Sequence, residues 1–242
     1  MKAKQAKKMG RKHFQSLNKD CEPWSRLLIC SFVIFVLSGC VNATLQEVRE
    51  RETGFVEGQS VVVIGRSNLP STAETELDFI ECVAADLSKN DKGLRVITAD
   101  EFRDLVFPWF EPRVEPEQSA QLAGLLNQPR LAAQLDSIDL RYPVWVDGRT
   151  SRTSSAGSLG CAVGPGGGGC FGFLTWDNDA SYEATVWDTQ IGQTAGRISS
   201  DAEGTSYMPA FVVPLPIVAR VKSNACKSLS KQIANFLSSE DT

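Results

Sequence analysis

Histidine is nearly absent from this chain. The single one, His13, lies close to the start, and none follows it in a sequence of 242 residues. Without an imidazole, the rest of the chain cannot assemble a Ser-His-Asp or Cys-His nucleophile, a histidine-ligated zinc site or an imidazole acid or base. Carboxylates are plentiful, but no spacing singles out a pair suited to glycosidase-type chemistry. The sequence therefore predicts no catalytic residue, no metal site and no cofactor.

Positive charge is also scarce once the first 39 residues are set aside. They hold eight of the 25 Lys and Arg residues but only two of the 29 Asp and Glu residues. The remaining 17 cations and 27 anions give residues 40–242 a net charge of about −10. Phosphate binding needs clustered cations, so a nucleic-acid partner is not expected.

A basic leader precedes a short apolar run, Leu27–Leu37. Eleven helical residues span about 16 Å, roughly half of a hydrocarbon core of about 30 Å, so the run is typical of a signal peptide rather than a membrane span. The following Leu37-Ser38-Gly39-Cys40 resembles the lipobox of bacterial lipoproteins. The resemblance implies that residues 1–39 are removed and Cys40 is lipidated. Ordinary cleavage that leaves Cys40 as a free thiol is the alternative.

The residue after Cys40 bears on the destination of such a lipoprotein. Val41 is not the aspartate that commonly retains lipoproteins in the inner membrane, so the resemblance favours the outer membrane, facing the periplasm. A diacylglycerol group would supply two acyl chains and palmitate a third, and these chains would hold the protein firmly without spanning the bilayer. Residues 40–59 are polar and lack periodicity, which predicts a tether between the lipid and the fold.

Residues 60–238 predict a single domain of the α/β (α+β) class, with a mixed sheet in two or three layers. A β-branched strand at 60–64 and a helix to about residue 89 form a first unit. The remaining patterns predict a strand at 94–98, helices at 101–107 (capped by Asp100), 118–126 and 129–135, and strands at 141–148, 170–176, 181–188 and 194–199. A closing amphipathic helix follows a Pro-broken segment at 209–216. The predicted order is β-α-β-α-α-β-β-β-β-α. Pro143 lacks a backbone donor and indicates an edge strand or a bulge.

Four cysteines remain besides Cys40, an even number that suits disulfides in an oxidising compartment. Cys161 and Cys170 bracket a glycine-rich stretch, so a local bridge would close a predicted loop or insertion at about 149–174. Cys82 and Cys226 would then pair, provided that their two predicted helices pack face to face. Two other pairings, and a metal held by all four thiolates, are the alternatives.

The glycine tract and the aromatic residues could each carry function. Gly164–Gly169 is not followed by Gly-Lys-Ser/Thr, so no nucleotide site is expected. The densest aromatic cluster lies at 102–110, where core packing and partner binding are both open interpretations. The candidate partner-binding residues are Phe107, Trp109, Phe110, Phe171 and Phe173.

Several stretches resemble known envelope proteins. Asp139–Gly148, Val186–Gln193 and Ala225–Leu237 resemble motifs of the α/β domain shared by the curli-secretion lipoprotein, the lipoprotein activators of penicillin-binding proteins and the amino-terminal domain of the Tol-Pal translocation protein. Asp78–Cys82, Phe107–Pro112 and Ser181–Asp188 resemble a set of uncharacterised proteobacterial outer-membrane lipoproteins. The better-known relatives bind partners or oligomerise into a pore, so the resemblance implies no catalytic residue.

The leading hypothesis is a non-catalytic, lipid-anchored periplasmic protein that binds another envelope protein as an assembly or regulatory accessory. One alternative is an oligomeric export-pore component like the curli-secretion lipoprotein, with residues 149–174 entering the membrane. Membrane strands need about nine to eleven alternating residues, a pattern that the glycine tract interrupts. The other alternative is a periplasmic hydrolase that uses two buried, facing carboxylates.

Overall fold

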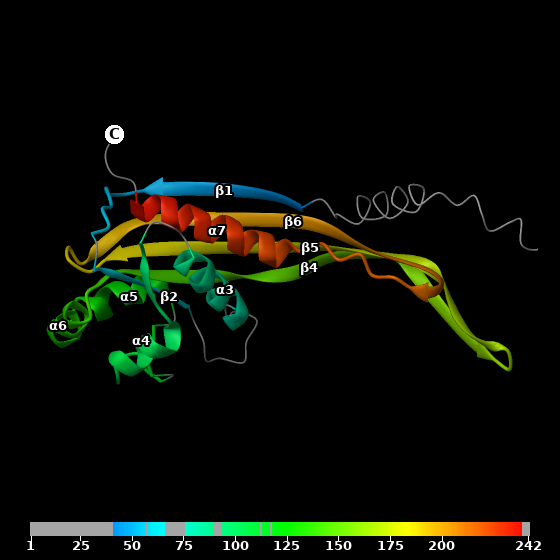
Figure 1. Ribbon diagram of the computed structural model, residues 1–242, viewed down its shortest axis with the longest axis horizontal. Coiled ribbons are helices and arrows are strands. Elements are labelled where there is room, and N and C mark those ends of the chain that lie inside the picture. The colour runs from blue at the N-terminus through cyan, green and yellow to red at the C-terminus, as the bar shows by residue number, and fades with distance from the viewer. Residues whose placement is uncertain are drawn as a thin grey trace, which may run out of the picture. The chain divides into compact units, whose positions relative to one another are not determined.

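A six-stranded mixed sheet organises the protein, in the order β1-β6-β5-β4-β2-β3 (Figure 1). The computed structural model describes residues 41–56, 58–65, 76–89, 93–111, 113–116 and 118–238. The predicted signal peptide and Cys40 lie outside the described residues. The strands are β1 (Val41–Arg49), β2 (Ser60–Gly65), β3 (Arg95–Ile97), β4 (Leu140–Gly164), β5 (Gly167–Asp188) and β6 (Gln193–Pro214). The helices are α3 (Leu77–Ser88), α4 (Ala99–Leu105), α5 (Ser119–Leu126), α6 (Pro129–Ser137) and α7 (Val221–Ser238).

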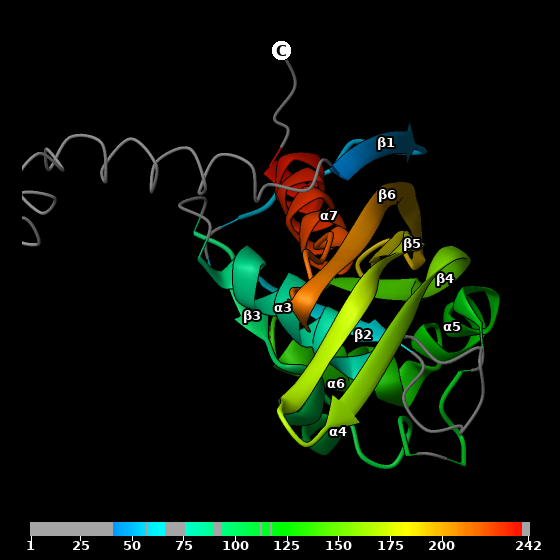
Figure 2. The same cartoon turned by 90° about the vertical axis from the view of Figure 1, so that its right-hand side faces the viewer.

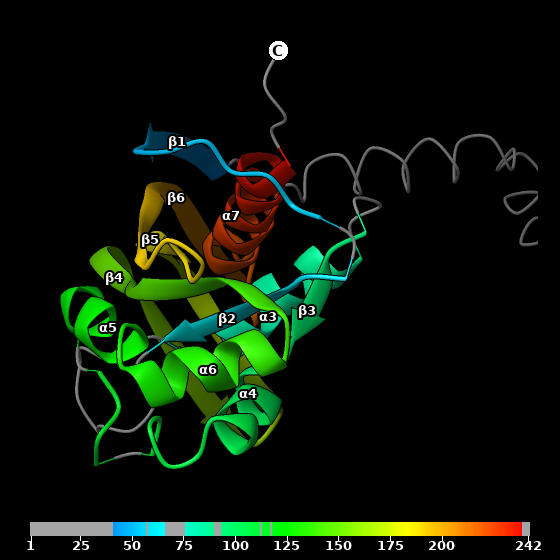
Figure 3. The ribbon, with the colours of Figure 1, turned by 90° about the vertical axis from the view of Figure 1, so that its left-hand side faces the viewer.

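Strand β2 is buried on both faces, and this makes the fold three-layered. It lies parallel to β3 and β4, while β4, β5, β6 and β1 pair in antiparallel fashion. Val61 and Val63 pack into one cluster with α3 and α7, and Val62 and Ile64 pack into a second cluster with α4, α5 and α6. Figure 3 shows α7 above β2 and the helices α4 and α6 below it. The predicted α/β class with a mixed sheet is confirmed.

The predicted tether is wrong for residues 41–49, because they form edge strand β1. It pairs with β6 from Val41 opposite Gly204 to Arg49 opposite Gly196. Most of its side chains are exposed, so backbone hydrogen bonds rather than an apolar pattern hold it. Arg49 adds a specific contact, since its guanidinium lies 4.0 Å from the Phe236 ring centroid and donates to the Phe236 carbonyl at 3.1 Å.

The loop predicted at 149–174 is instead regular sheet. Strands β4 and β5 pair from Val144 opposite Val186 as far as Gly164 opposite Gly167. Strand β5 also unites the two strands predicted at 170–176 and 181–188, and β6 extends to Pro214, into the segment at 209–216 predicted as Pro-broken. We call the projecting part the blade: residues 153–176 of β4 and β5 with residues 205–214 of β6. It extends beyond the helical layers (Figure 1) and points toward the viewer in Figure 2.

Two glycines of the blade allow neighbouring strands to approach each other closely. Gly157 and Gly172 have φ angles of 98° and 146°. A Cβ at either position would lie 2.1 or 2.3 Å from a carbonyl oxygen of the neighbouring strand. Only glycine fits such a backbone approach, so residues that suggested a loop are compatible with a continuous ladder.

Pro143 lies in β4, which is a central strand. The register between β2 and β4 slips between Ser60 and Val61, and pairing of β4 with β5 starts at Val144. The shift leaves out Arg141, whereas Pro143 lies in register opposite Val62 and one residue before the pairing with β5 begins. Pro143 therefore has a strand partner on one side only, as predicted for an edge, and the bulge lies two residues before it.

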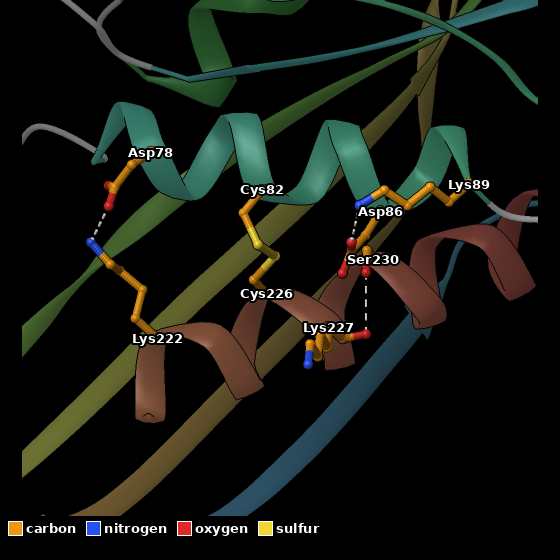
Figure 4. The surroundings of a disulfide bond; sticks show 8 residues. All are labelled: Asp78, Cys82, Asp86, Lys89, Lys222, Cys226, Lys227 and Ser230. Atoms are coloured by element: carbon orange, nitrogen blue, oxygen red, sulfur yellow. Dashed lines mark hydrogen bonds and ion pairs between the residues drawn. A yellow bond between two sulfur atoms is a disulfide. The ribbon is translucent and has the colours of Figure 1, made fainter. Parts of the chain in front are cut away.

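Both predicted disulfides are present. Cys82 of α3 bonds to Cys226 of α7, with a Cα separation of 6.3 Å (Figure 4). Cys161 bonds to Cys170 directly across β4 and β5, with a Cα separation of 4.0 Å. Because the four sulfur atoms are consumed in these bonds, the alternative of a four-thiolate metal site is wrong.

The two disulfides differ in what they hold together. Cys82–Cys226 closes a separation of 144 residues, for which chain entropy gives about 5 kcal/mol, and typical losses are about 2–5 kcal/mol. We expect Cys82→Ala with Cys226→Ala to lower the free energy of unfolding by about 3–5 kcal/mol in urea denaturation. The matched control, Cys161→Ala with Cys170→Ala, should cost less, about 2–3 kcal/mol, because the loop that this bond closes in the unfolded chain is far shorter. Equal losses would contradict this assignment.

Candidate partner-binding surfaces

The FPWF turn, residues Phe107–Phe110, divides its aromatic side chains between core and solvent. Phe110 is 4% exposed and packs edge-on against Phe102, with ring centroids 4.9 Å apart. Trp109 is partly buried against the same core cluster. Phe107 is 65% exposed. Of the candidates in this turn, Phe107 alone is free to make a large contact with a partner, and the core interpretation holds for Phe110.

Stability measurements separate these two roles. We expect Phe110→Ala to lower the free energy of unfolding by about 3–5 kcal/mol, because it opens a cavity in the core. Phe107→Ala should change it by less than about 0.5 kcal/mol, the range of ordinary surface substitutions. Urea denaturation followed by far-UV circular dichroism measures both. A large loss for Phe107→Ala would place that ring in the core.

A second exposed aromatic group lies on the blade. The sheet register puts Phe171 opposite Phe211, Phe173 opposite Pro209 and Thr175 opposite Tyr207. These residues therefore share one face. The ring centroids are 5.7 Å apart for Phe171 and Phe211 and 6.2 Å apart for Phe173 and Tyr207. We call Phe171, Phe173, Tyr207 and Phe211 the aromatic ladder.

The aromatic ladder contains two residues that the sequence interpretation missed. Tyr207 and Phe211 belong to the second half of β6, where the prolines suggested irregular structure. The signal that could have found them is the alternation of Tyr207, Pro209, Phe211 and Val213, which continues the spacing of a strand. Phe171 and Phe211 are 73% and 75% exposed, so the ladder faces solvent.

The opposite face of the blade is apolar as well. Val163 and Val212 are exposed there, beside the Cys161–Cys170 disulfide. The tip holds an open depression of about 540 Å³, lined by Gly160, Cys161, Ala162, Gly169, Cys170, Phe171, Phe211 and Val212. Its lining offers hardly any group that could fix a polar ligand, so apolar contact is the chemistry it supports.

The FPWF turn and the aromatic ladder are separate surfaces. Figure 1 places α4, which leads into the turn, far along the horizontal axis from the tip of β4 and β5. The structure therefore divides the five predicted residues into Phe107 on the body, Phe110 and most of Trp109 in the core, and Phe171 with Phe173 on the blade.

Asp188 is the carboxylate buried in the described part of the chain. Its Oδ2 accepts from Arg141 Nη2 at 2.7 Å, and its Oδ1 accepts from the backbone N–H of Gln190 at 2.9 Å. This arrangement ties the turn after β5 to the start of β4. A hydrolase using carboxylates alone would require a second buried carboxylate facing the first, and Asp188 faces a guanidinium instead.

A polar network lies beside the Cys82–Cys226 disulfide. Tyr182 stacks on Phe79 and donates its hydroxyl proton to the Glu76 carboxylate. Burial raises the pKa of Tyr182, and the bond to Glu76 raises it further. Lys222 bonds to Asp78 at 2.5 Å (Figure 4). Partial burial lowers the pKa of Lys222, but the bond to Asp78 and the neighbouring negative charges outweigh it and the net shift is upward.

These shifts predict a loss of stability in alkali. A raised folded-state pKa contributes stability that is fully present below the unfolded pKa, about 10 for tyrosine, and is lost as pH rises through the folded value. We expect the free energy of unfolding to fall between pH 9 and about 11, and to fall less in Tyr182→Phe, which has no phenol to ionise. Urea titrations at the two pH values measure the difference. Equal slopes for both proteins would contradict the role given to Tyr182.

No family model matches the chain, and no curated protein does so. Among solved structures, the chain is similar to the PelC dodecamer from Paraburkholderia phytofirmans, with 12% identity and a TM-score of 0.38 over 82% of this chain and 100% of that chain. A point variant of that dodecamer matches with 13% identity and a TM-score of 0.35, over 84% and 100% of the chains.

The resemblances to the three named families and to the uncharacterised lipoproteins stay predictions. Within the part of the chain that the structure describes, no helix is both long and apolar enough to cross a membrane.

Proposed function

We propose that this protein is a lipid-anchored periplasmic accessory protein of the bacterial outer membrane that acts by binding another envelope protein, without catalysis. One observation carries the proposal: on a well-packed domain, the Phe107 ring of the FPWF turn is exposed to solvent. Exposed apolar surface of this kind marks binding sites in soluble domains. Aromatic rings dominate the energy of such contacts.

The proposed localisation, at the outer membrane and facing the periplasm, is based on the sequence and on redox chemistry. The lipobox ends at Cys40, and β1 begins at the next residue, Val41. An anchor at Cys40 would therefore hold the domain close to the bilayer. The two disulfides suit an oxidising compartment such as the periplasm.

The FPWF turn is the surface that best suits a protein partner. Phe107 supplies an exposed ring, and exposed Leu105 and Val114 lie on either side of the turn in sequence. Exposed Glu101 and Glu111 provide charge nearby. An apolar centre with a polar surround is the usual composition of a protein interface.

The export-pore alternative draws on the pairing of β4 with β5, which shifts register at Thr153 but continues to Gly164 opposite Gly167, so the glycine tract does not interrupt the strands. Strands that line a pore also need polar side chains on one face. The blade has aromatic rings on one face and Val163, Val212 and a disulfide on the other. This composition does not favour a pore, so we keep the accessory role.

Site-specific photo-crosslinking in intact envelopes tests the proposal. We expect a benzoylphenylalanine placed at Phe107 to give a covalent adduct with one protein of defined mass. The same probe at Ile191, a matched exposed apolar residue in the turn between β5 and β6, should give none. Phe107→Ser should abolish copurification of that protein while the chain remains folded. Identical adduct patterns at the two positions, or none at Phe107, would count against a partner on the FPWF turn.

A further inference from the structure

Charged residues stop at one line across the sheet. Residues 153–176 and 204–219 contain no Asp, Glu, Lys or Arg. Charge resumes at Arg152 in β4, Asp177 in β5 and Glu203 in β6. The register aligns these limits, because Asp177 lies opposite Ser154 on one side and Thr205 on the other. The blade is therefore an uncharged projection from a domain whose net charge is strongly negative.

The boundary is built from specific contacts. Ser154 and Thr205 donate their hydroxyl protons to the two carboxylate oxygens of Asp177. The hydrogen bond from Ser154 has the larger effect and that from Thr205 the smaller. Together they hold the pKa of Asp177 below its usual value, so the carboxylate stays ionised. On the other face, the Arg152 guanidinium lies 5.3 Å from the Trp176 ring centroid. The last charges before the blade on β5 and β4, Asp177 and Arg152, are thus held by specific contacts.

Strand β1 starts at the same line. Val41, which follows the predicted lipidated residue Cys40, pairs with Gly204 at the edge of the charged region. The chain therefore leaves the sheet, toward any acyl chains, where charge ends and the blade begins. Phe211 lies seven residues further along β6, which corresponds to about 23 Å of strand.

From this geometry we infer that the blade lies in the lipid–water interface of the membrane leaflet that receives the acyl chains of Cys40, with the aromatic ladder among the headgroups. The inference rests on the lipid anchor of the proposed function. It assigns the blade to lipid and leaves the FPWF turn to the protein partner.

Three properties favour lipid as the occupant. Aromatic side chains such as those of the ladder are enriched at membrane interfaces. Both faces of the tip are apolar, which suits a surrounding layer better than a partner on one side. The absence of charge from the blade removes the desolvation cost that a charged side chain would carry on entering lipid.

The open edges of the blade limit how deeply it enters. Strand β4 pairs with β2 only as far as Val146, so its outer edge along the blade has no strand partner within the described residues. Unpaired backbone groups are not tolerated in the hydrocarbon core. An interfacial position, with apolar side chains buried by about 5–10 Å, leaves these groups accessible to water.

Vesicle binding without the anchor tests the inference. Residues 40–242 form a compact unit with its own core, so this segment is used with Cys40→Ser. We expect it to partition onto phosphatidylcholine vesicles in a sedimentation assay. Phe171→Ser and Phe211→Ser should each lower the partition coefficient about tenfold, the effect of withdrawing one buried phenylalanine. The matched control, Ile191→Ser, should leave it unchanged. Equal partitioning of all variants, or none by the parent, would overturn the inference.

Photo-crosslinking in the anchored protein provides a second measurement that keeps the native aromatic bulk. Benzoylphenylalanine at Phe211 should yield adducts whose added mass is that of a phospholipid. Adducts with a different protein or with a second copy of this chain would overturn the assignment to lipid, and so would the absence of any lipid adduct.

Failure of the inference is distinguishable from failure of the proposed function. Palmitate labelling that is lost in Cys40→Ser tests the lipid anchor. The crosslinked adduct at Phe107 tests the protein partner. If the anchor and the Phe107 adduct are both observed but the blade variants bind vesicles as well as the parent does, only the assignment of the blade to lipid is contradicted. If labelling is absent, the anchor fails, and vesicle binding of the anchor-free segment still reads the blade by itself.

Discussion

The continuous antiparallel ladder of β4, β5 and β6 is the constraint on which the rest of the structure depends. Its first part lies between the two helical layers, and its second part leaves them as the blade. A backbone ladder satisfies its polar groups by pairing, whatever the side chains are. The same three strands can therefore support a packed core at one end and an exposed, uncharged surface at the other.

The two helical layers depend on this ladder in different ways. Helices α3 and α7 cover one face and are joined by Cys82–Cys226 and by the ion pair of Lys222 with Asp78 (Figure 4). The other face is covered by α4, α5 and α6 around buried Trp145 and Phe102. The FPWF turn emerges from this second layer. Because Phe110 anchors the turn in the core, Phe107 is presented to solvent by a supported backbone.

The distribution of charge distinguishes the two ends of the domain. The body is acidic, the blade is uncharged, and strand β1 begins at the border between them. An anchor attached just before β1 would turn the blade toward the lipid and the FPWF turn away from it. The accessory role and the interfacial position that we propose are thus two consequences of one arrangement.

The sequence by itself determined the features that a local pattern encodes. The β-branched run at β2, the closing helix α7 and the local Cys161–Cys170 bridge could be predicted, because each depends on composition or spacing over a short range, and the α/β class followed from the order of the elements. Cys82 and Cys226 are 144 residues apart, so their pairing depends on the packing of α3 against α7 and was one of three possible pairings in the sequence. Only the tertiary structure decided that residues 41–49 form a strand, that the Ser- and Gly-rich stretch around Gly157 is a ladder, and that Tyr207 and Phe211 join Phe171 and Phe173. Pairing with a distant strand uses backbone atoms that every residue carries. The side-chain pattern of an exposed strand therefore does not indicate which strand it pairs with.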